Sequence, residues 1–181
     1  MDDTYIEDGV RERLIIAGIN ELSEHGISDF SLRRTAQRAE VSCAAPYRHF
    51  KDKDDLIFGM CQYIISKWEL LCREILEAYS TDSRRAVLEV SVAIVRFFSA
   101  NANFRSFLTL PSFYERCDFD AYLDLAIKKY VDESGITSRL SMISYAVKTE
   151  IYGMVMLVAM NKIGVDEAVS LLRRIVSTYV M

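Results

Sequence analysis

The chain has 181 residues, of which 51% are hydrophobic and 27% charged, and its formal net charge is −4. This length suits one domain or two small ones with a real core, and only two prolines and seven glycines favour long helices. The four cysteines contain no Cys-x-x-Cys pair, which argues against a metal site and predicts free thiols in a reducing compartment.

The start of the chain and its longest apolar run both bear on the compartment. The first residues, Met1-Asp2-Asp3, are acidic where a secretion signal would be basic. The longest uncharged apolar run, Ile151 to Met160, is shorter than the ~17–25 residues that a membrane-spanning helix needs. We therefore expect a cytoplasmic protein without a membrane partner.

The first predicted element is a helix that ends at His25-Gly26. Val10, Leu14, Ala17 and Leu22 follow one another at helical spacing, and the glycine is a typical C-terminal cap. This helix is expected to brace the segment that follows, with Phe30 and Phe50 filling a small three-helix core.

Residues 31–53 predict two short helices joined by a tight turn. Ser31 is placed to cap the first and Ser42 the second. Pro46 is tolerated only in a first helical turn, so the second helix must begin close to it. This pattern indicates a helix-turn-helix.

The charge of this segment differs from that of the rest of the chain. Six Lys or Arg residues stand against Glu40 and Asp52, a net of +4, so the remaining residues sum to −8. Cations gathered on one helix pair of an acidic protein indicate a phosphate-binding surface. The alternative is a solvated basic surface with no nucleic-acid role.

The remaining elements are also helical, so the predicted fold class is all-α. Asp52 is placed to cap a long helix from Lys53 to about Tyr79, and 80–83 is a linker. Further helices are expected over 84–100, 104–110, 120–133, 138–162 and 166–180, with an irregular segment over 113–119.

The last two predicted helices are the most apolar. Between Ile151 and Met160 the first of them is apolar on all sides, so it must be covered on all sides. A symmetric four-helix interface between two copies, formed by residues 138–180, would cover it. The alternative is that this hairpin is only the core of a monomer.

Residues 10–57 resemble the DNA-binding domain of the TetR family of transcriptional regulators. The resemblance is carried by Ala17, Leu22 and Gly26, by Ser31 and Ala36, by Val41-Ser42, by Tyr47-Arg48-His49-Phe50, and by Lys53 before Asp54-Asp55-Leu56. Three positions depart from the family pattern: Glu40 replaces the turn glycine, Thr35 an aliphatic residue, and Glu21 an apolar residue.

The resemblance implies a DNA-binding domain over 1–52 and a helical ligand-binding and dimerisation domain over 53–181. Phosphate contacts are then expected from Ser31, Arg33, Tyr47, His49 and Lys53. Base readout is expected from Ser42, Cys43, Ala44, Ala45 and Arg48, with Arg48 as the best candidate because Arg to guanine is the commonest specific contact.

The family also places an inducer cavity within its C-terminal helical domain. The expected lining residues are Trp68, Phe97, Phe107, Tyr122 and Tyr152, which suit a small apolar or aromatic effector. Aromatic residues at helical spacing are also typical of an ordinary core, so that alternative stays open.

The sequence contains no catalytic spacing, no phosphate-cradling glycine loop and no metal cluster, so we expect neither an enzyme nor a cofactor. The resulting hypothesis is a homodimeric repressor that binds a near-palindromic operator in double-stranded DNA and is released by a small effector. Two alternatives are a helical protein-interaction module without effector control and a redox-sensing regulator acting through Cys43.

Overall fold

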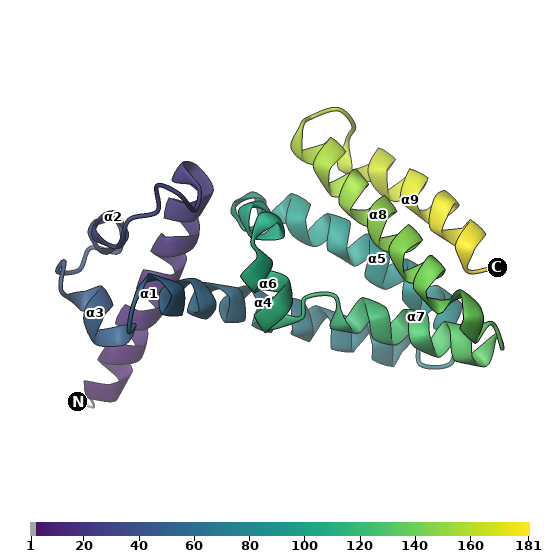
Figure 1. The fold of residues 1–181 in the computed structure, drawn as a ribbon, viewed down its shortest axis with the longest axis horizontal. Helices are drawn as coiled ribbons and strands as arrows, with labels where there is room; N and C mark the ends of the chain where they lie inside the picture. Colours follow the sequence, from purple (N-terminus) through teal and green to yellow (C-terminus); the bar gives the residue numbers. More distant parts are fainter. Residues whose placement is uncertain (1–2) are drawn as a thin grey trace. The chain divides into compact units, whose positions relative to one another are not determined.

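The computed structural model describes residues 3–181, with side chains described for residues 9–111, 113 and 115–181. The described chain is helical and contains no strand, as predicted (Figure 1). Its elements, in order, are α1 (Asp3–His25), α2 (Leu32–Arg38), α3 (Ala45–His49), α4 (Lys53–Ala78), α5 (Ser83–Ala100), the 3₁₀ helix η1 (Ala102–Thr109), α6 (Pro111–Cys117), α7 (Ala121–Glu133), the 3₁₀ turn η2 (Thr137–Arg139), α8 (Leu140–Ala159) and α9 (Val165–Tyr179).

The chain forms two compact units. Unit 1 comprises Met1–Ser66 and Asn103–Asp118, and unit 2 comprises Lys67–Ala102 and Phe119–Met181. The predicted domain boundary at residues 52 and 53 marks the start of α4, whereas the units divide within α4. A functional division at residue 53 therefore stays a prediction.

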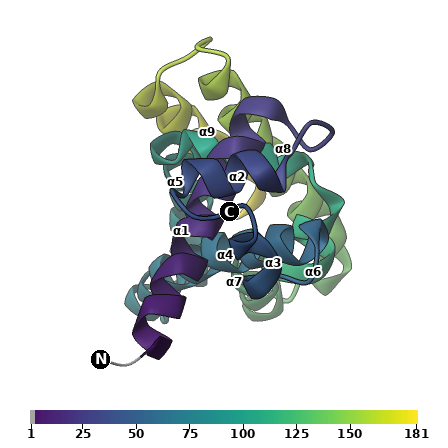
Figure 2. The same cartoon turned by 90° about the vertical axis from the view of Figure 1, so that its left-hand side faces the viewer.

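In unit 1, α2 and α3 pack against α1 and against each other (Figures 1 and 2). The core contains Leu14 and Leu22 from α1, and Phe30 and Phe50 are 7% and 4% exposed, as expected for the centre of a three-helix core. Gly26 ends α1 with φ of 71°, a left-handed conformation that glycine adopts without steric cost. Its N–H donates to the Leu22 carbonyl, so the predicted C-terminal cap is confirmed.

The segment predicted to be irregular contains α6, so that prediction was wrong. Pro111 is the first residue of α6, where its missing N–H has no intrahelical partner to lose. Phe113 is fully buried, with its ring centroid 5.9 Å from that of Phe107 in η1. This tertiary contact stabilises a helix that is too short to show helical periodicity in sequence.

Unit 2 is a bundle in which α5 packs against α7, α8 and α9. It contains an aromatic cluster of Trp68, Phe97, Phe98 and Phe119. The Trp68 indole N–H donates to the Phe119 carbonyl at 3.1 Å, so the buried indole has a partner.

The α8 helix is three residues shorter than predicted at its C-terminus. Asn161 adopts a left-handed conformation with φ of 54°, and the Lys162 N–H donates to the Leu157 carbonyl. This is the geometry of a helix C-cap, in which asparagine substitutes for glycine. At the N-terminus, the 3₁₀ turn η2 precedes the first α-helical turn.

By length and composition, Thr137–Ala159 is long and apolar enough to span a membrane. In the structure, 28% of its most apolar 18-residue stretch is buried. A core helix of a helical bundle meets the same criterion. Ile143, Val147 and Ile151 on α8 are fully buried in unit 2. The composition of this segment therefore carries no membrane assignment.

Candidate nucleic-acid interface

The turn between α2 and α3 adopts the left-handed geometry that glycine would favour, with Glu40 in its place. Glu40 has φ of 56°, and the following Val41 N–H donates to the Ala36 carbonyl at 3.0 Å, which closes the end of α2. A non-glycine residue in this conformation costs about 1–2 kcal/mol. The Glu40 side chain is exposed.

The two predicted helix caps have different outcomes. Ser31 caps α2, since its hydroxyl oxygen accepts the Arg34 N–H at 3.4 Å. The cap predicted at Ser42 was wrong, because Ala44 is the capping residue of α3 and makes no side-chain cap bond. Pro46 is the second helical residue and has no N–H that a cap could satisfy. Ser42 contributes its backbone carbonyl instead, which accepts the Ala45 N–H at 2.9 Å.

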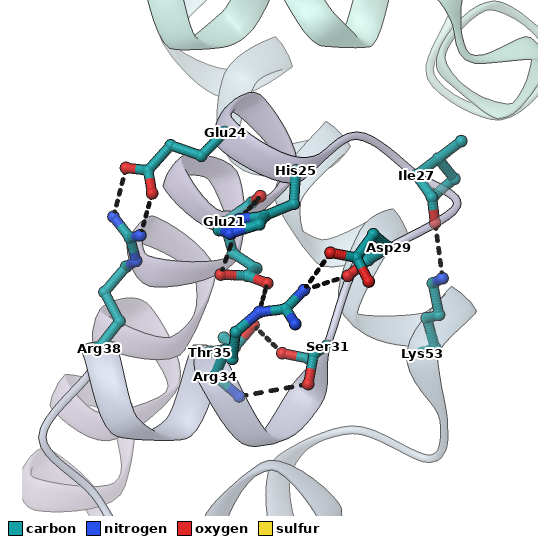
Figure 3. Close-up of polar contacts among 10 residues, drawn as sticks. All are labelled: Glu21, Glu24, His25, Ile27, Asp29, Ser31, Arg34, Thr35, Arg38 and Lys53. Atoms are coloured by element: carbon teal, nitrogen blue, oxygen red, sulfur yellow. Dashed lines mark hydrogen bonds and ion pairs between the residues drawn. The ribbon is translucent and has the colours of Figure 1, made fainter.

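Two acids on α1 hold two arginines on α2 (Figure 3). Glu21 is 1% exposed, and its Oε1 accepts the Arg34 Nε–H at 2.5 Å. One turn further along α1, Glu24 accepts two hydrogen bonds from the Arg38 guanidinium. Each helix thus presents its charges one turn apart, and the pairs join the C-terminal end of α1 to α2.

These ion pairs shift the pKa values of Glu24, Arg34 and Arg38. The hydrogen bond from Arg38 lowers the pKa of Glu24, and the same contact raises the pKa of Arg38. The hydrogen bond to Glu21 raises the pKa of Arg34. Glu21 also lies 3.4 Å from the His25 ring nitrogen, and Arg34 also contacts Asp29, which makes Glu21 the centre of a small polar network.

Arg34 and Arg38 therefore face partners within the protein. Both belong to the six cations of residues 31–53, but the sequence does not predict their pairing. Glu21 occupies a position where an apolar residue is expected, and its partner Arg34 lies thirteen residues further along the chain. Glu21 and Thr35 are polar residues at positions where an apolar residue is expected, and both are buried. Glu21 is paired with Arg34, and the Thr35 hydroxyl donates to the Ser31 carbonyl.

Lys53 ties the start of α4 to the loop between α1 and α2. Its ammonium donates to the Ile27 carbonyl at 2.8 Å (Figure 3). The ammonium also lies 5.4 Å from the centre of the Phe30 ring. The predicted cap of α4 is confirmed, since Asp52 Oδ1 accepts the Asp55 N–H at 2.8 Å. The first turn of α4 is thus held by both its own cap and the preceding loop.

The remaining predicted DNA contacts are mostly exposed. Tyr47 is 66% exposed, His49 and Ser31 are half-buried, and no ion pair among the described side chains involves the exposed cations Arg33, Arg48 and Lys51. The other exposed residues predicted to read bases are Ser42, Cys43 and Ala44. Ala45 is 8% exposed, so most of its methyl group faces the interior of unit 1.

A second surface follows one side of α8 in unit 2. Its exposed positions recur every three or four residues and carry no charge; we call them the α8 face: Met142, Tyr145, Thr149, Gly153, Met156, Leu157 and Met160. Exposed fractions reach 73% at Tyr145 and 58% at Met160. A β-carbon added at Gly153 would meet no atom within 4 Å, so the centre of the face is open.

The residues predicted to line an effector cavity lie in both units. Trp68, Phe97, Tyr122 and Tyr152 belong to unit 2, and the fully buried Phe107 belongs to unit 1. The Trp68 and Phe97 ring centroids lie 5.4 Å apart. The Tyr152 hydroxyl donates to Asp120, and the Tyr122 hydroxyl accepts from Arg73 Nε at 3.4 Å, so both phenol groups already have protein partners.

Known proteins resemble this chain both in sequence and in fold. Residues 14–60 match the family model described as bacterial regulatory proteins, tetR family. An HTH-type transcriptional regulator from Staphylococcus aureus (strain bovine RF122 / ET3-1) is 29% identical over 82 residues, which cover 45% of this chain. The match spans 43% of that relative, less than half of its length.

Solved structures match the fold over almost the whole chain. A TetR family transcription regulator from Marinobacter aquaeolei VT8 superposes with a TM-score of 0.72 at 18% identity, over 98% of both chains. The transcriptional regulator FadR from Bacillus subtilis, solved in complex with stearoyl-CoA, superposes with a TM-score of 0.65 at 16% identity, over 93% of this chain and 97% of its own.

Proposed function

Because the chain belongs to the TetR family of bacterial regulatory proteins, we propose that it represses transcription by binding a specific operator in double-stranded DNA. Members of this family are transcription regulators, so the chain is not an enzyme. The observation that carries the proposal is the exposed basic face of α3 and the start of α2, two helices that pack against α1, with ion pairs between α1 and α2.

In this proposal α3 enters the major groove as the recognition helix. Arg48 reads a base edge as an exposed, unpaired donor, and Ser42, Cys43 and Ala44 lie close to the bases at the exposed start of the helix. Arg33, Tyr47 and His49 contact phosphates on either side, with Ser31 and Lys53 at the ends of the two flanking helices. Phosphate contacts position the protein, and base contacts select the sequence.

The α8 face supports a homodimer through residues 138–180. Its seven exposed positions form one uncharged stripe, and Gly153 allows a second helix to approach closely. Two copies related by a two-fold axis would bury the face and present two recognition helices to half-sites about 34 Å apart on a near-palindromic operator.

The proposed effector is a small, mainly apolar molecule bound in unit 2 near Trp68, Phe97, Tyr122 and Tyr152. The polar tips of Trp68, Tyr122 and Tyr152 have protein partners, so ring faces would supply most of the contact. The effector would release DNA by binding more tightly to a dimer whose recognition helices no longer match the operator spacing. FadR, a solved relative of this fold, carries stearoyl-CoA, a ligand with a long apolar chain.

Selection of bound sequences from random duplex DNA, with the thiols reduced, tests the DNA-binding proposal. We expect one preferred near-palindromic sequence, with the logarithm of its affinity falling by about 0.9 per contacted phosphate for each unit of log salt concentration. Enrichment of no sequence at low salt would overturn the proposal. We expect the protein in the cytoplasm, where such an operator would be reached.

The effector proposal has its own readout, because Trp68 is the only tryptophan in the chain. An effector bound beside Trp68 should change its fluorescence at the same concentration at which it releases the selected operator. A molecule that releases DNA without changing this fluorescence would place the effector elsewhere. Light scattering of the DNA-free protein separates a homodimer from a monomeric interaction module.

A further inference from the structure

A polar cleft lies between α7 and α8 in unit 2, two helices that pack against each other. Its volume of about 330 Å³ falls within the range of small-molecule sites. Asp124 and Lys128 line it from α7, and Ser141, Ser144 and Lys148 line it from α8. None of these residues is among those proposed above to contact DNA or the effector.

A chain of hydrogen bonds that crosses between the two helices fixes one wall of the cleft. The Lys148 ammonium donates to Asp124 Oδ2 at 2.8 Å and lies 3.2 Å from Asp120 Oδ2. The Ser144 hydroxyl donates to Asp124 Oδ1 at 3.0 Å, and the Tyr152 hydroxyl donates to Asp120 Oδ1. The Asp124 carboxylate is thus held in place from α8, so its position does not depend on a ligand.

Lys128 is the cation of the cleft that remains available. It is exposed, and no ion pair among the described side chains involves it. It lies one turn after Asp124 on α7, a spacing at which Asp and Lys often pair. Here Asp124 is turned toward Ser144 and Lys148 instead, so an ammonium and a carboxylate line the same cleft without pairing with each other.

Asp124 retains the capacity to accept further hydrogen bonds. Each of its oxygens accepts one described hydrogen bond, whereas a carboxylate offers about four acceptor positions in all. Its side chain is 46% exposed, so the remaining positions are accessible from the cleft. The cleft therefore offers a free donor of positive charge on Lys128 and a free acceptor of negative charge on Asp124.

The charges around the cleft balance. Asp120 and Asp124 contribute two negative charges, and Lys128 and Lys148 contribute two positive charges. Burial alone would lower the pKa of Lys148, but its hydrogen bond to Asp124 and the charge of Asp120 raise it, so this ammonium stays charged at neutral pH. A ligand with one net charge would remain uncompensated here, whereas a zwitterion pairs both signs and keeps the sum at zero.

We propose that this cleft binds a free amino acid with an apolar side chain. The ligand carboxylate accepts from Lys128 and from the Ser141 hydroxyl, and the ligand ammonium donates to Asp124. The ligand side chain lies against Leu140 and the exposed Tyr145 ring, the apolar part of the lining. This binding needs neither DNA nor the effector proposed near the aromatic cluster, so it stands independently of the proposed function.

Calorimetric titration of the full chain, without DNA and with its thiols reduced, tests the proposal. The cleft borders the α8 face, because Tyr145 belongs to both, so the protein is kept in its own oligomeric state. The probes are L-phenylalanine, 3-phenylpropionate, which lacks the ammonium, and phenethylamine, which lacks the carboxylate. We expect each analogue to bind at least about tenfold more weakly than L-phenylalanine, because each loses a hydrogen bond to a charged group. Equal binding of the three probes, or no binding of either L-phenylalanine or L-leucine, would overturn the proposal.

Two lysine variants locate the binding site. Lys128→Met keeps the aliphatic stem but removes the charge, so it should weaken L-phenylalanine about tenfold and leave phenethylamine unchanged. The matched control is Lys129→Met on the same helix, since the Lys129 ammonium contacts the Ser80 carbonyl and Glu133 and should leave the affinity at the wild-type value. Wild-type affinity in Lys128→Met would overturn the site, and a simultaneous change in Trp68 fluorescence would then place the amino acid at the aromatic cluster instead.

Discussion

The helix-turn-helix of unit 1 and the α8 face of unit 2 both have exposed side chains, but the first surface is charged and the second is not. Around α2, acids from α1 neutralise two arginines and leave other cations exposed. On α8, the seven exposed positions carry no charge at all. Salt should therefore weaken the binding of the helix-turn-helix to its partner, because exposed charges are screened. Binding through the α8 face should instead depend on the burial of apolar surface.

The largest expected effect is on the α8 face. Gly153→Trp should leave the fold of each chain intact, because the site is open, but should block a second helix and convert the dimer to a monomer. Operator affinity should then fall by about 10²–10⁴-fold, since both half-sites are no longer bound together. Light scattering and gel shifts measure the two effects.

Leu70→Trp is the matched control for this change. Leu70 is 65% exposed on α4 in unit 2 but lies outside the α8 face, so the same added side chain should leave the dimer intact. A dimeric Gly153→Trp protein would show that the face is not the dimer interface.

The second prediction compares the two ion pairs of unit 1. Arg34→Ala leaves the Glu21 carboxylate buried without its arginine, which is strongly unfavourable. Arg38→Ala leaves Glu24, which is 53% exposed, in contact with water. Thermal unfolding should therefore show a clearly larger fall in Tm for Arg34→Ala, and equal falls would mean that burial of Glu21 has no energetic consequence.

The third prediction concerns base readout. Arg48→Ala should relax specificity at one operator position by about 1–3 kcal/mol, because an exposed guanidinium is removed from the recognition helix. Arg33→Ala should instead weaken binding to all sequences alike and reduce the salt slope by about 1. Repeated sequence selection and salt titration distinguish these outcomes, and an unchanged selected sequence for Arg48→Ala would exclude its reading role.

The fourth prediction concerns the turn. Glu40→Gly removes the cost of a left-handed non-glycine residue and should stabilise the protein by about 1 kcal/mol in chemical denaturation. Asn161→Gly is the corresponding change at the end of α8, where asparagine already tolerates this conformation, so its gain should be smaller. A destabilised Glu40→Gly protein would contradict this account.

The smallest expected effect concerns an ion pair inside unit 2. Glu89 on α5 accepts two hydrogen bonds of 2.7 Å from Arg173 on α9, and these lower its pKa. Since the folded pKa lies below the unfolded one, the pair stabilises the fold at neutral pH, and this contribution is lost as the pH falls through the lowered pKa. Glu89→Gln should reduce the loss of unfolding free energy between pH 7 and pH 3 by about 1 kcal/mol or less, as measured by unfolding at the two pH values.

Local sequence patterns were sufficient for much of the fold. The order of the long helices, the caps at Ser31 and Asp52, the Gly26 stop and the pattern of residues 31–53 depend on interactions within a few residues of one another. The same is true of the family resemblance, because its motif is a set of local spacings. The sequence also placed Phe30 and Phe50 in the core, since large apolar residues near a helix-turn-helix have few other places to go.

Only the tertiary structure decided the features that join distant segments. The helix after Pro111 forms because Phe113 is buried, and Glu21 is accepted in the interior because Arg34 reaches it from another helix. The ion pair between Glu89 and Arg173 joins residues 84 positions apart, a separation at which periodicity carries no information. Short-range spacing thus determined the long helices, whereas packing determined the short helix α6 and which charges are paired.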